Sequence, residues 1–457
     1  MSAPKQTAYE DAPLTRFHIR VAVAGTGGQF SDGFVLGIVG IVLASATAAL
    51  NLTPLWIGLL GAATLAGLFI GAIVTGPIAD RIGRRRIFGW DMLVFGALSA
   101  LQFFVQEPWQ LLVLRLLLGV ALGADYVVSK SLVTEHSPRH FRGRLMSFLA
   151  IAWALGYVIA YLAGFLLSGL GPDAWRWMLL VSAAPALIVF GFRLGVPESP
   201  LWLTQHGRLQ EAADVVRRHA GPNVAPPPAG SAKPARGLAV LFSAKYRRRT
   251  MVGAVFYVCQ VIPYFALGTF APQVMEALGV SGKLAAGAAY NVFLLVGAIV
   301  GMLIIDRISR RAFLIGSFIL GAALLLALVL FASVSPVLAV ILFASFALVL
   351  SAAANLEFAY PPELFPTELR ASGVGVATAS SRLGSAGSTF LLPLVVAGAG
   401  ISTALSACVV VLLIGAVVCW RWAPETRTES LAAVDEEIDT PHHTERPGAI
   451  ALQDNRT

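Results

Sequence analysis

The sequence predicts an all-α membrane protein in which 12 transmembrane helices form two pseudo-symmetric six-helix bundles. The 457 residues are 57% hydrophobic and only 13% charged, whereas a soluble domain carries about 25% charged residues. The apolar residues fall into runs of the ~20 residues that a helix needs to cross a bilayer. These runs come as six, a long polar interval, and then six more.

The predicted spans divide the chain into two halves. Residues 20–196 contain runs near 20–48, 55–78, 87–106, 109–133, 144–169 and 175–196. Residues 249–420 contain runs near 249–275, 284–305, 312–333, 336–361, 370–397 and 400–420. Long runs broken by glycine, rather than alternating ten-residue segments, favour helices over a β-barrel.

Three polar segments lie outside the spans. Residues 1–19 and 421–457 are tails, the second of them acid-rich. Residues 197–248 are predicted to form a short amphipathic helix from Leu201 to His219, followed by a Pro/Gly/Ala linker from Pro222 to Arg236.

The distribution of the 33 Lys and Arg residues predicts the orientation. If both termini are cytoplasmic, the outer loops contain only Arg176 and Lys283, as the positive-inside rule requires. We therefore expect a multi-pass membrane protein with both termini in the cytoplasm. The net charge of +8 is scattered between hydrophobic blocks and does not indicate nucleic acid.

Two loops indicate an internal duplication. Residues 76–86 read GPIADRIGRRR after the second span, and residues 305–311 read IDRISRR after the eighth. Parallel six-helix repeats are a known transporter architecture, with the substrate site between the halves near mid-membrane.

These loops resemble the signature loop of the major facilitator superfamily. Its sugar-porter branch is indicated by residues 197–203 (PESPLWL), 360–366 (YPPELFP) and 424–427 (PETR). Segments 32–34 (DGF), 123–126 (GADY), 175–178 (WRWM) and 259–263 (CQVIP) look like bacterial inner-membrane metabolite transporters of that branch. The resemblance implies transport by alternating access, with no cofactor.

The predicted cavity departs from that of a sugar porter. Sugar porters typically place two glutamines in the seventh helix and a tryptophan in the tenth. This chain has Cys259 before a single Gln260, and Phe358 where the tryptophan would fall. A hydroxyl buried without a hydrogen-bond partner costs about 1–3 kcal/mol. The resemblance assigns Gln260 and Phe358 to the cavity, but the shortage of neutral polar groups disfavours a sugar.

Ionisable residues inside the spans are candidate site residues, because a charge at the bilayer centre costs from about 2.5 to more than 10 kcal/mol. At ~1.5 Å of rise per residue, Asp32 and Asp125 lie about 18 and 15 Å from the inner face. Buried carboxyls can exchange protons near neutral pH. Both are therefore predicted proton or substrate-cation sites in the central cavity. The alternatives are structural ion pairs, with an arginine for Asp32 and with Lys130 for Asp125.

Arg382 lies about 18 Å deep in the eleventh span by the same rise. Its segment, residues 379–385 (ASSRLGS), resembles the part of organic-anion transporters where an arginine meets the substrate carboxylate. A guanidinium stays charged, and its planar fork matches a carboxylate. We expect the substrate to displace Asp32 from Arg382, so that Asp32 can take a proton. The alternative is a static salt bridge.

Two more charged residues are assigned from their depth and pattern. Glu357, about 9 Å deep, is either a second acid beside the cavity or an interfacial residue that reaches a cytoplasmic arginine. Arg115, with Gly119 and Gly123, follows a superfamily pattern in which small residues four apart allow close helix contact. We assign Arg115 to packing, with a part in proton movement as the alternative.

Charged residues at the inner helix ends are predicted to form a cytoplasmic gate. In the resembled family such residues form salt bridges between the halves in the outward-open state. Each exposed pair contributes only ~0–1 kcal/mol, but several together bias a two-state equilibrium. Asp91 is assigned to the same gate, and Gly67, Gly71 and Gly76 are expected to let the second span slide. The gate residues are Asp80, Arg84, Arg85, Glu135, Arg142, Glu198, Asp306, Arg310, Glu363, Arg370 and Glu425.

The predicted function is secondary active transport of a small organic anion, preferably a carboxylate, together with a proton. The partners are the substrate, protons and the lipid bilayer, and the protein is expected to act as a monomer. A sugar or metabolite uniporter, a drug–proton antiporter and a non-transporting nutrient sensor remain as alternatives. No nucleotide loop, zinc pattern or nucleophile motif indicates an enzyme.

Overall fold

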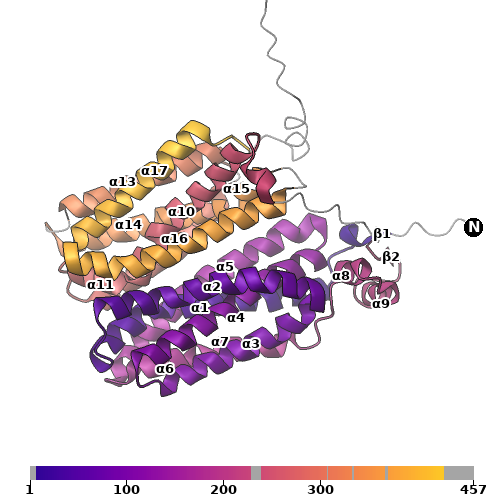
Figure 1. The fold of residues 1–457 in the computed structure, drawn as a ribbon, viewed down its shortest axis with the longest axis horizontal. Coiled ribbons are helices and arrows are strands. Elements are labelled where there is room, and N and C mark those ends of the chain that lie inside the picture. The colour runs from indigo at the N-terminus through magenta and orange to yellow at the C-terminus, as the bar shows by residue number, and fades with distance from the viewer. Residues whose placement is uncertain (1–6, 228–237, 306, 332–333, 366–368, 427–457) are drawn as a thin grey trace, which may run out of the picture.

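Helices dominate the structure. The computed structural model describes residues 7–227, 238–305, 307–331, 334–365 and 369–426. Within these ranges, 12 helices are long and apolar enough to cross a membrane. They form two bundles that lie side by side (Figure 1), which confirms the predicted fold class.

The N-terminal bundle contains six crossings. They are α1 (Arg16–Ala49), α2 (Pro54–Ile82), α3 (Arg84–Leu101), α4 (Pro108–His136), α5 (Arg139–Leu167), and α6 (Ala174–Val181) continued by α7 (Ala183–Arg193). The sixth crossing is interrupted at Ser182. Pro185 lies just beyond the break and has no N–H with which to bond the carbonyl of Val181, so a continuous helix would lose that bond.

The C-terminal bundle repeats this order. Its crossings are α10 (Arg247–Thr269), α12 (Lys283–Ile304), α13 (Arg310–Phe331), α14 (Pro336–Ala354) continued by α15 (Leu356–Glu363), α16 (Arg370–Ala399) and α17 (Ile401–Trp422). The short helix α11 (Ala271–Ala277) extends α10 and has Pro272 in its first turn, a position where proline needs no N–H partner.

Equivalent helices pack together in the two bundles. In the first bundle α1 packs on α5, α2 on α4 and α3 on α7. In the second, α10 packs on α16, α12 on α14 and α13 on α17. This correspondence supports the duplication predicted from the two loops. The bundles contact each other through α2 with α16 and through α5 with α12.

Glycines allow α2 and α4 to approach closely. A Cβ atom at Gly67 would contact the backbone of Leu116 and Gly119, and one at Gly71 would contact the backbone of Val120. Nothing lies within 4 Å of the corresponding position at Gly76. Gly76 therefore takes no part in this helix contact, contrary to the prediction from its spacing.

The segment after α7 forms two short helices, α8 (Pro200–Gln205) and α9 (Leu209–His219). The sequence predicted one helix here, but Gly207 has a φ of 73° and turns the chain between them. Strand β1 (Thr7–Ala8) pairs in parallel with β2 (Val224–Ala225) and ties the N-terminal segment to α9. We call this end of the molecule the α8–α9 end and the opposite end the α11 end (Figure 1).

Candidate functional site

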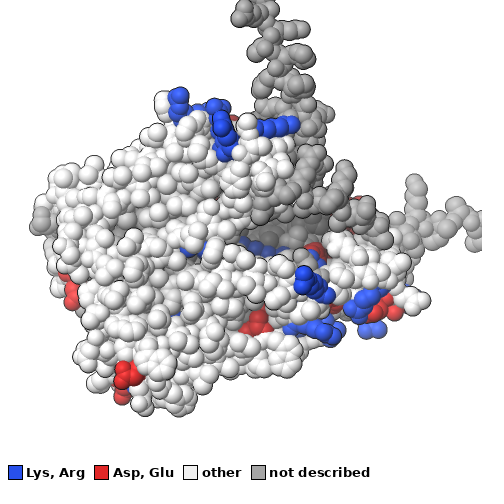
Figure 2. All heavy atoms as spheres, viewed as in Figure 1, with Lys and Arg blue, Asp and Glu red and all other residues white. Residues whose placement is uncertain are grey.

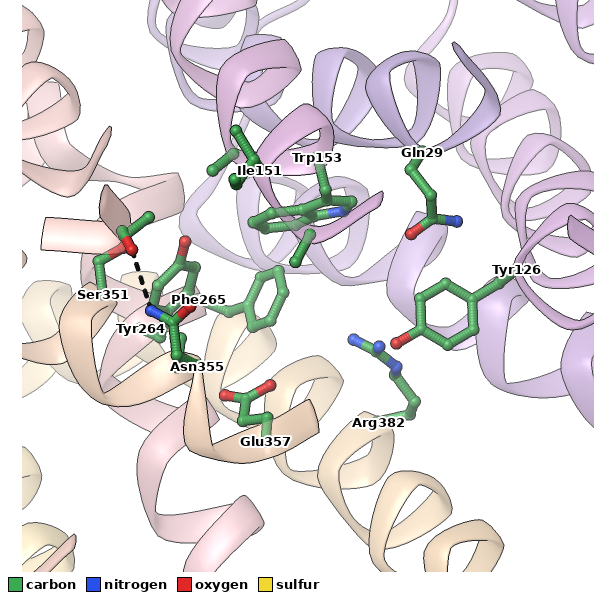
Figure 3. A pocket seen from close by; sticks show the side chains of 14 residues that line it. Gln29, Tyr126, Ile151, Trp153, Tyr264, Phe265, Ser351, Asn355, Glu357 and Arg382 are labelled. Carbon is green, nitrogen blue, oxygen red and sulfur yellow. Dashed lines mark hydrogen bonds between the residues drawn. The ribbon is translucent and has the colours of Figure 1, made fainter. Parts of the chain in front are cut away.

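A cavity lies between the two bundles and has a volume of about 700 Å³, including its open mouth. Both bundles contribute to its wall (Figure 3). The main lining side chains are Gln29 of α1, Tyr126 of α4, Trp153 of α5, Tyr264 and Phe265 of α10, Ser351 of α14, Asn355, Glu357 of α15, and Arg382 of α16.

Aromatic rings form much of the wall. The Trp153 ring lies 6.2 Å from the rings of both Tyr264 and Phe265, measured between centroids. The amide nitrogen of Asn355 is already used, because it donates to the carbonyls of Ala298 and Ala352 at 3.1 Å. The wall therefore combines aromatic faces with the polar atoms of Gln29, Tyr126 and Ser351.

Arg382 supplies a cation to this aromatic cavity. Its guanidinium carbon lies 5.0 Å from the centroid of the Tyr126 ring, and only 8% of the residue is exposed. Its Nε atom is buried and has no hydrogen-bond partner. The charge of Glu357 acts on Arg382, but no ion pair joins Arg382 to a carboxylate in the described part of the chain.

Lys130 brings a second cation to Tyr126. The Nζ atom of Lys130 lies 3.5 Å from the centroid of the Tyr126 ring, within the range of a cation–π contact. With Glu357 as the carboxylate of the wall, these three side chains carry a formal charge of one positive unit. Two cations therefore lie against the Tyr126 ring.

Asp32 lies behind the cavity wall rather than in it. It is fully buried, and its Oδ2 accepts a hydrogen bond of 3.2 Å from Nε2 of Gln29. The expected contact with Arg382 is not formed in this structure, because Asp32 faces the interior of its own bundle. Gln29, which does line the cavity, connects the cavity to Asp32.

Asp125 is held by an arginine that the sequence interpretation left without a role. Nη1 of Arg193, the last residue of α7, lies 2.6 Å from Oδ1 of Asp125 and 3.1 Å from Oδ1 of Asp91. Nη2 of Arg193 donates to the Ser129 hydroxyl at 2.9 Å. Asp125 is thus neither in the cavity wall nor paired with Lys130, and Asp91 belongs to this buried cluster rather than to a gate.

Two other predicted residues have packing contacts. Gln260 is 1% exposed, and its Nε2 lies 3.4 Å from the carbonyl of Leu350 on α14. It therefore joins two helices of one bundle and does not line the cavity. Nε of Arg115 donates to the carbonyl of Leu60 at 3.1 Å and joins α4 to α2, which fits the packing role.

Glu198 and Glu425 occupy equivalent positions in the two bundles. The Glu198 carboxylate accepts the backbone N–H groups of Arg84 and Arg85, both at 3.1 Å, where α3 begins. Glu425 accepts those of Arg310 and Arg311 at 3.0 and 3.2 Å, where α13 begins. A carboxylate is stabilised there by unpaired N–H groups and by the helix dipole.

The other predicted gate residues for which contacts are described also pair within one bundle. Arg84 and Glu135 form an ion pair of 3.1 Å, and Arg310 and Glu363 one of 3.5 Å. The side chains of Asp80, Arg142, Phe358 and Arg370, and the whole of Asp306, lie outside the described part of the structure.

Direct hydrogen bonds join the bundles at the α11 end. Nε2 of Gln273 donates to the carbonyl of Gly40 at 3.2 Å, and the Tyr161 hydroxyl donates to the carbonyl of Leu284 at 3.1 Å. A Cβ atom at Gly40 would contact the carbonyl of Thr269. The bundles are therefore closely apposed at the α11 end.

Comparison with known proteins identifies the family. Residues 20–438 match the model of the sugar (and other) transporter family. The chain belongs to this family, a branch of the major facilitator superfamily. It is therefore a membrane transporter of the sugar-porter type that carries metabolites, and not an enzyme.

Relatives and solved structures agree with this assignment. The sequence is 43% identical to the inner membrane metabolite transport protein YgcS of Escherichia coli, over 93% of this chain and 95% of that protein. It is 27% identical to the niacin transporter NiaP of Acinetobacter baylyi, over 93% of this chain and 98% of that protein. The fold resembles the inward-open xylose transporter XylE of E. coli, with a TM-score of 0.75, 19% identity and coverage of 92% and 99%.

Proposed function

We propose that this sugar-porter-type transporter carries a small aromatic or similarly flat carboxylate together with a proton. The observation that carries the proposal is Arg382, a buried guanidinium in an aromatic cavity wall whose Nε has no hydrogen-bond partner. A planar carboxylate matches the guanidinium fork, and charge-assisted hydrogen bonds of this kind are roughly twice as strong as neutral ones.

The shape and the polarity of the cavity support the same class of substrate. The rings of Trp153, Tyr264 and Phe265 provide flat apolar surface, and the amide nitrogen of Asn355 is already bound to two carbonyls of the protein. One relative of this chain is named a niacin transporter, and niacin is an aromatic carboxylate. We therefore place carboxylates ahead of sugars.

Asp32 is the proposed proton-coupling carboxylate. Gln29 lies in the cavity wall and donates to Asp32, so a substrate that contacts Gln29 changes the hydrogen bonding of the carboxylate behind it. The Oδ1 atom of Asp32 is buried without a partner, a position where a proton would supply the missing donor. Substrate binding and proton binding are thereby linked through two residues of one helix.

We assign the α8–α9 end to the cytoplasm. Lys and Arg gather toward this end on the face shown in Figure 2, as expected for the cytoplasmic side of an inner-membrane protein. The α11 end then faces outward, and the contacts there close the outer side of the transporter. Both chain termini are expected in the cytoplasm, and the two bundles rock about the cavity between them.

Uptake into proteoliposomes tests the proposal. Radiolabelled benzoate and nicotinate are compared with their amides and with xylose, with and without an inward proton gradient. We expect gradient-driven uptake of the acids alone. Arg382→Gln should weaken apparent affinity about tenfold to a hundredfold, because a charged hydrogen bond contributes ~1.5–3 kcal/mol.

The control is Arg421→Gln, which removes an exposed arginine from α17 and should leave uptake unchanged. Equal uptake of acids and amides, or gradient-driven uptake of xylose alone, would overturn the carboxylate assignment. Full carboxylate uptake and proton coupling in Arg382→Lys would show that the guanidinium fork is not required.

A further inference from the structure

The buried cluster around Arg193 contains more carboxyl groups than one arginine can neutralise. Asp91 of α3 and Asp125 of α4 pair with Arg193 of α7, and the charges of all three act on Asp32 of α1. All four residues are at most 6% exposed. Lys130 is the further cation whose charge acts on Asp32. Because a buried charge without a counter-charge is very costly, the cluster is expected to retain protons.

The geometry places two of these carboxyls together. Nη1 of Arg193 binds Oδ1 of both Asp91 and Asp125, at 3.1 and 2.6 Å. The second oxygen of each carboxyl is buried and has no hydrogen-bond donor. Because both Oδ1 atoms contact the same nitrogen of Arg193, the two carboxyl groups lie beside each other. A proton bound by one of the two carboxyls would turn it into an O–H donor. The other carboxyl could then accept that hydrogen bond.

We propose that Asp91 and Asp125 share one proton and form a second proton-binding site of the transporter, distinct from Asp32. Arg193 is the positioning residue, because its Nη1 atom holds one oxygen of each carboxyl. The proposal extends the proton coupling described above. It concerns a proton that Asp32 does not hold, and it places no substrate atom at the pair.

Asp91 also borders a groove that is separate from the substrate cavity. Asp91 lines an apolar groove between α3 and α4, together with Arg86, Trp90 and Ala121. Arg86 lies in the first turn of α3, near the α8–α9 end. Among the described residues, this groove and the substrate cavity share no lining side chain.

The pair is also connected electrostatically to the coupling carboxylate. The charges of Asp125 and Asp91 act on Asp32, and such an interaction is reciprocal. Loss of the shared proton would make the cluster more negative and would favour protonation of Asp32. The pair would thus adjust the proton affinity of the residue behind the cavity wall.

Infrared spectroscopy of the reconstituted protein tests the shared proton without any substrate. The wild type should show the carbonyl stretching band of a protonated carboxyl at neutral pH. Asp91→Asn and Asp125→Asn should each remove a band that persists in Asp32→Asn. The exposed Asp173→Asn is the control and should leave the spectrum unchanged. If both asparagine variants of the pair retain the full wild-type spectrum, the proposal is wrong.

Transport measurements give a second readout. Asp91→Asn and Asp125→Asn should each reduce proton-driven accumulation about tenfold more than they reduce substrate exchange, within the range usual for coupled sites. Equal losses in both assays would indicate a structural role and contradict the proposal. One folded variant is sufficient, because either substitution removes the shared proton. If the wild type accumulates no carboxylate, the proposed function fails, while the infrared result still decides the pair.

Discussion

Replacing Arg193 with methionine should strongly destabilise the N-terminal bundle. Arg193 donates to two carboxylates, to the hydroxyl of Ser129 and to the carbonyl of Phe88 at 3.1 Å, and its guanidinium lies 3.9 Å from the centroid of the Phe88 ring. Removing one partner of a buried ion pair costs about 3–5 kcal/mol. Two hydrogen bonds to charged groups, at ~1.5–3 kcal/mol each, give a similar sum.

The assay is denaturant-induced unfolding of the purified protein in detergent micelles, followed by tryptophan fluorescence. Arg193→Met should lower the free energy of unfolding by about 3–5 kcal/mol, whereas the exposed Arg421→Met should change it by less than about 0.5 kcal/mol. Adding Asp91→Asn and Asp125→Asn to Arg193→Met should recover most of the loss, because no unpaired carboxylate remains at that position. A fully stable Arg193→Met variant would refute the reasoning, and so would a triple variant no more stable than the single one.

Three further predictions concern packing, capping and pH. Gly67→Val should separate α2 from α4 and lower the free energy of unfolding by about 1–3 kcal/mol. The control Gly76→Ala, at a position with open space around it, should leave that free energy unchanged or raise it by up to ~1 kcal/mol. An unchanged stability in Gly67→Val would contradict the close contact between the two helices. Glu198→Ala should lower the free energy of unfolding by about 0.5–2 kcal/mol, because the first N–H groups of α3 lose their cap. The loss should exceed that of Glu211→Ala on the exposed face of α9, as measured by denaturant-induced unfolding. Burial lowers the pKa of His219, whose ring stacks on Phe17 at 4.2 Å, so the folded state resists protonation of His219. The stability that neutral His219 contributes is therefore present above the pKa of the unfolded chain, ~6.5, and is lost as the pH falls below that value. Replacing His219 with phenylalanine should make the melting temperature less dependent on pH between 5 and 7.5.

The fold was predictable because each membrane span is a continuous run of apolar residues. Each span is long, apolar and nearly free of charge, which is typical of a helix in lipid. The two similar loops show where the six-helix unit repeats. The single helix predicted for residues 201–219 was wrong, since one glycine with positive φ, Gly207, turns the chain within it.

The candidate site was only partly predictable, for a geometric reason. Counting residues from a helix end gives depth in the membrane but not the direction in which a side chain points. Arg382 and Glu357 were singled out by charge, and both lie in the cavity wall. Asp32 was placed at the same depth as Arg382, yet it points into its own bundle.

Neutral and aromatic lining residues gave no signal of their own. Trp153, Tyr264 and Phe265 stand in apolar runs where most such side chains pack against lipid or other helices. Gln29 precedes Asp32 by nearly one helical turn, and that spacing is the signal that would have connected the two. Arg193 was overlooked because it ends its span, although three buried carboxyls in one bundle require a cation.

The most direct test of carboxylate recognition is a structure of the transporter with 4-bromobenzoate bound, in which anomalous scattering locates the bromine. The carboxylate should lie within hydrogen-bond distance of the Arg382 guanidinium, with the ring between Trp153 and Tyr264 and the bromine away from Arg382. A ligand bound outside this cavity, or bound in it with its carboxylate turned away from Arg382, would contradict the proposed mode of recognition.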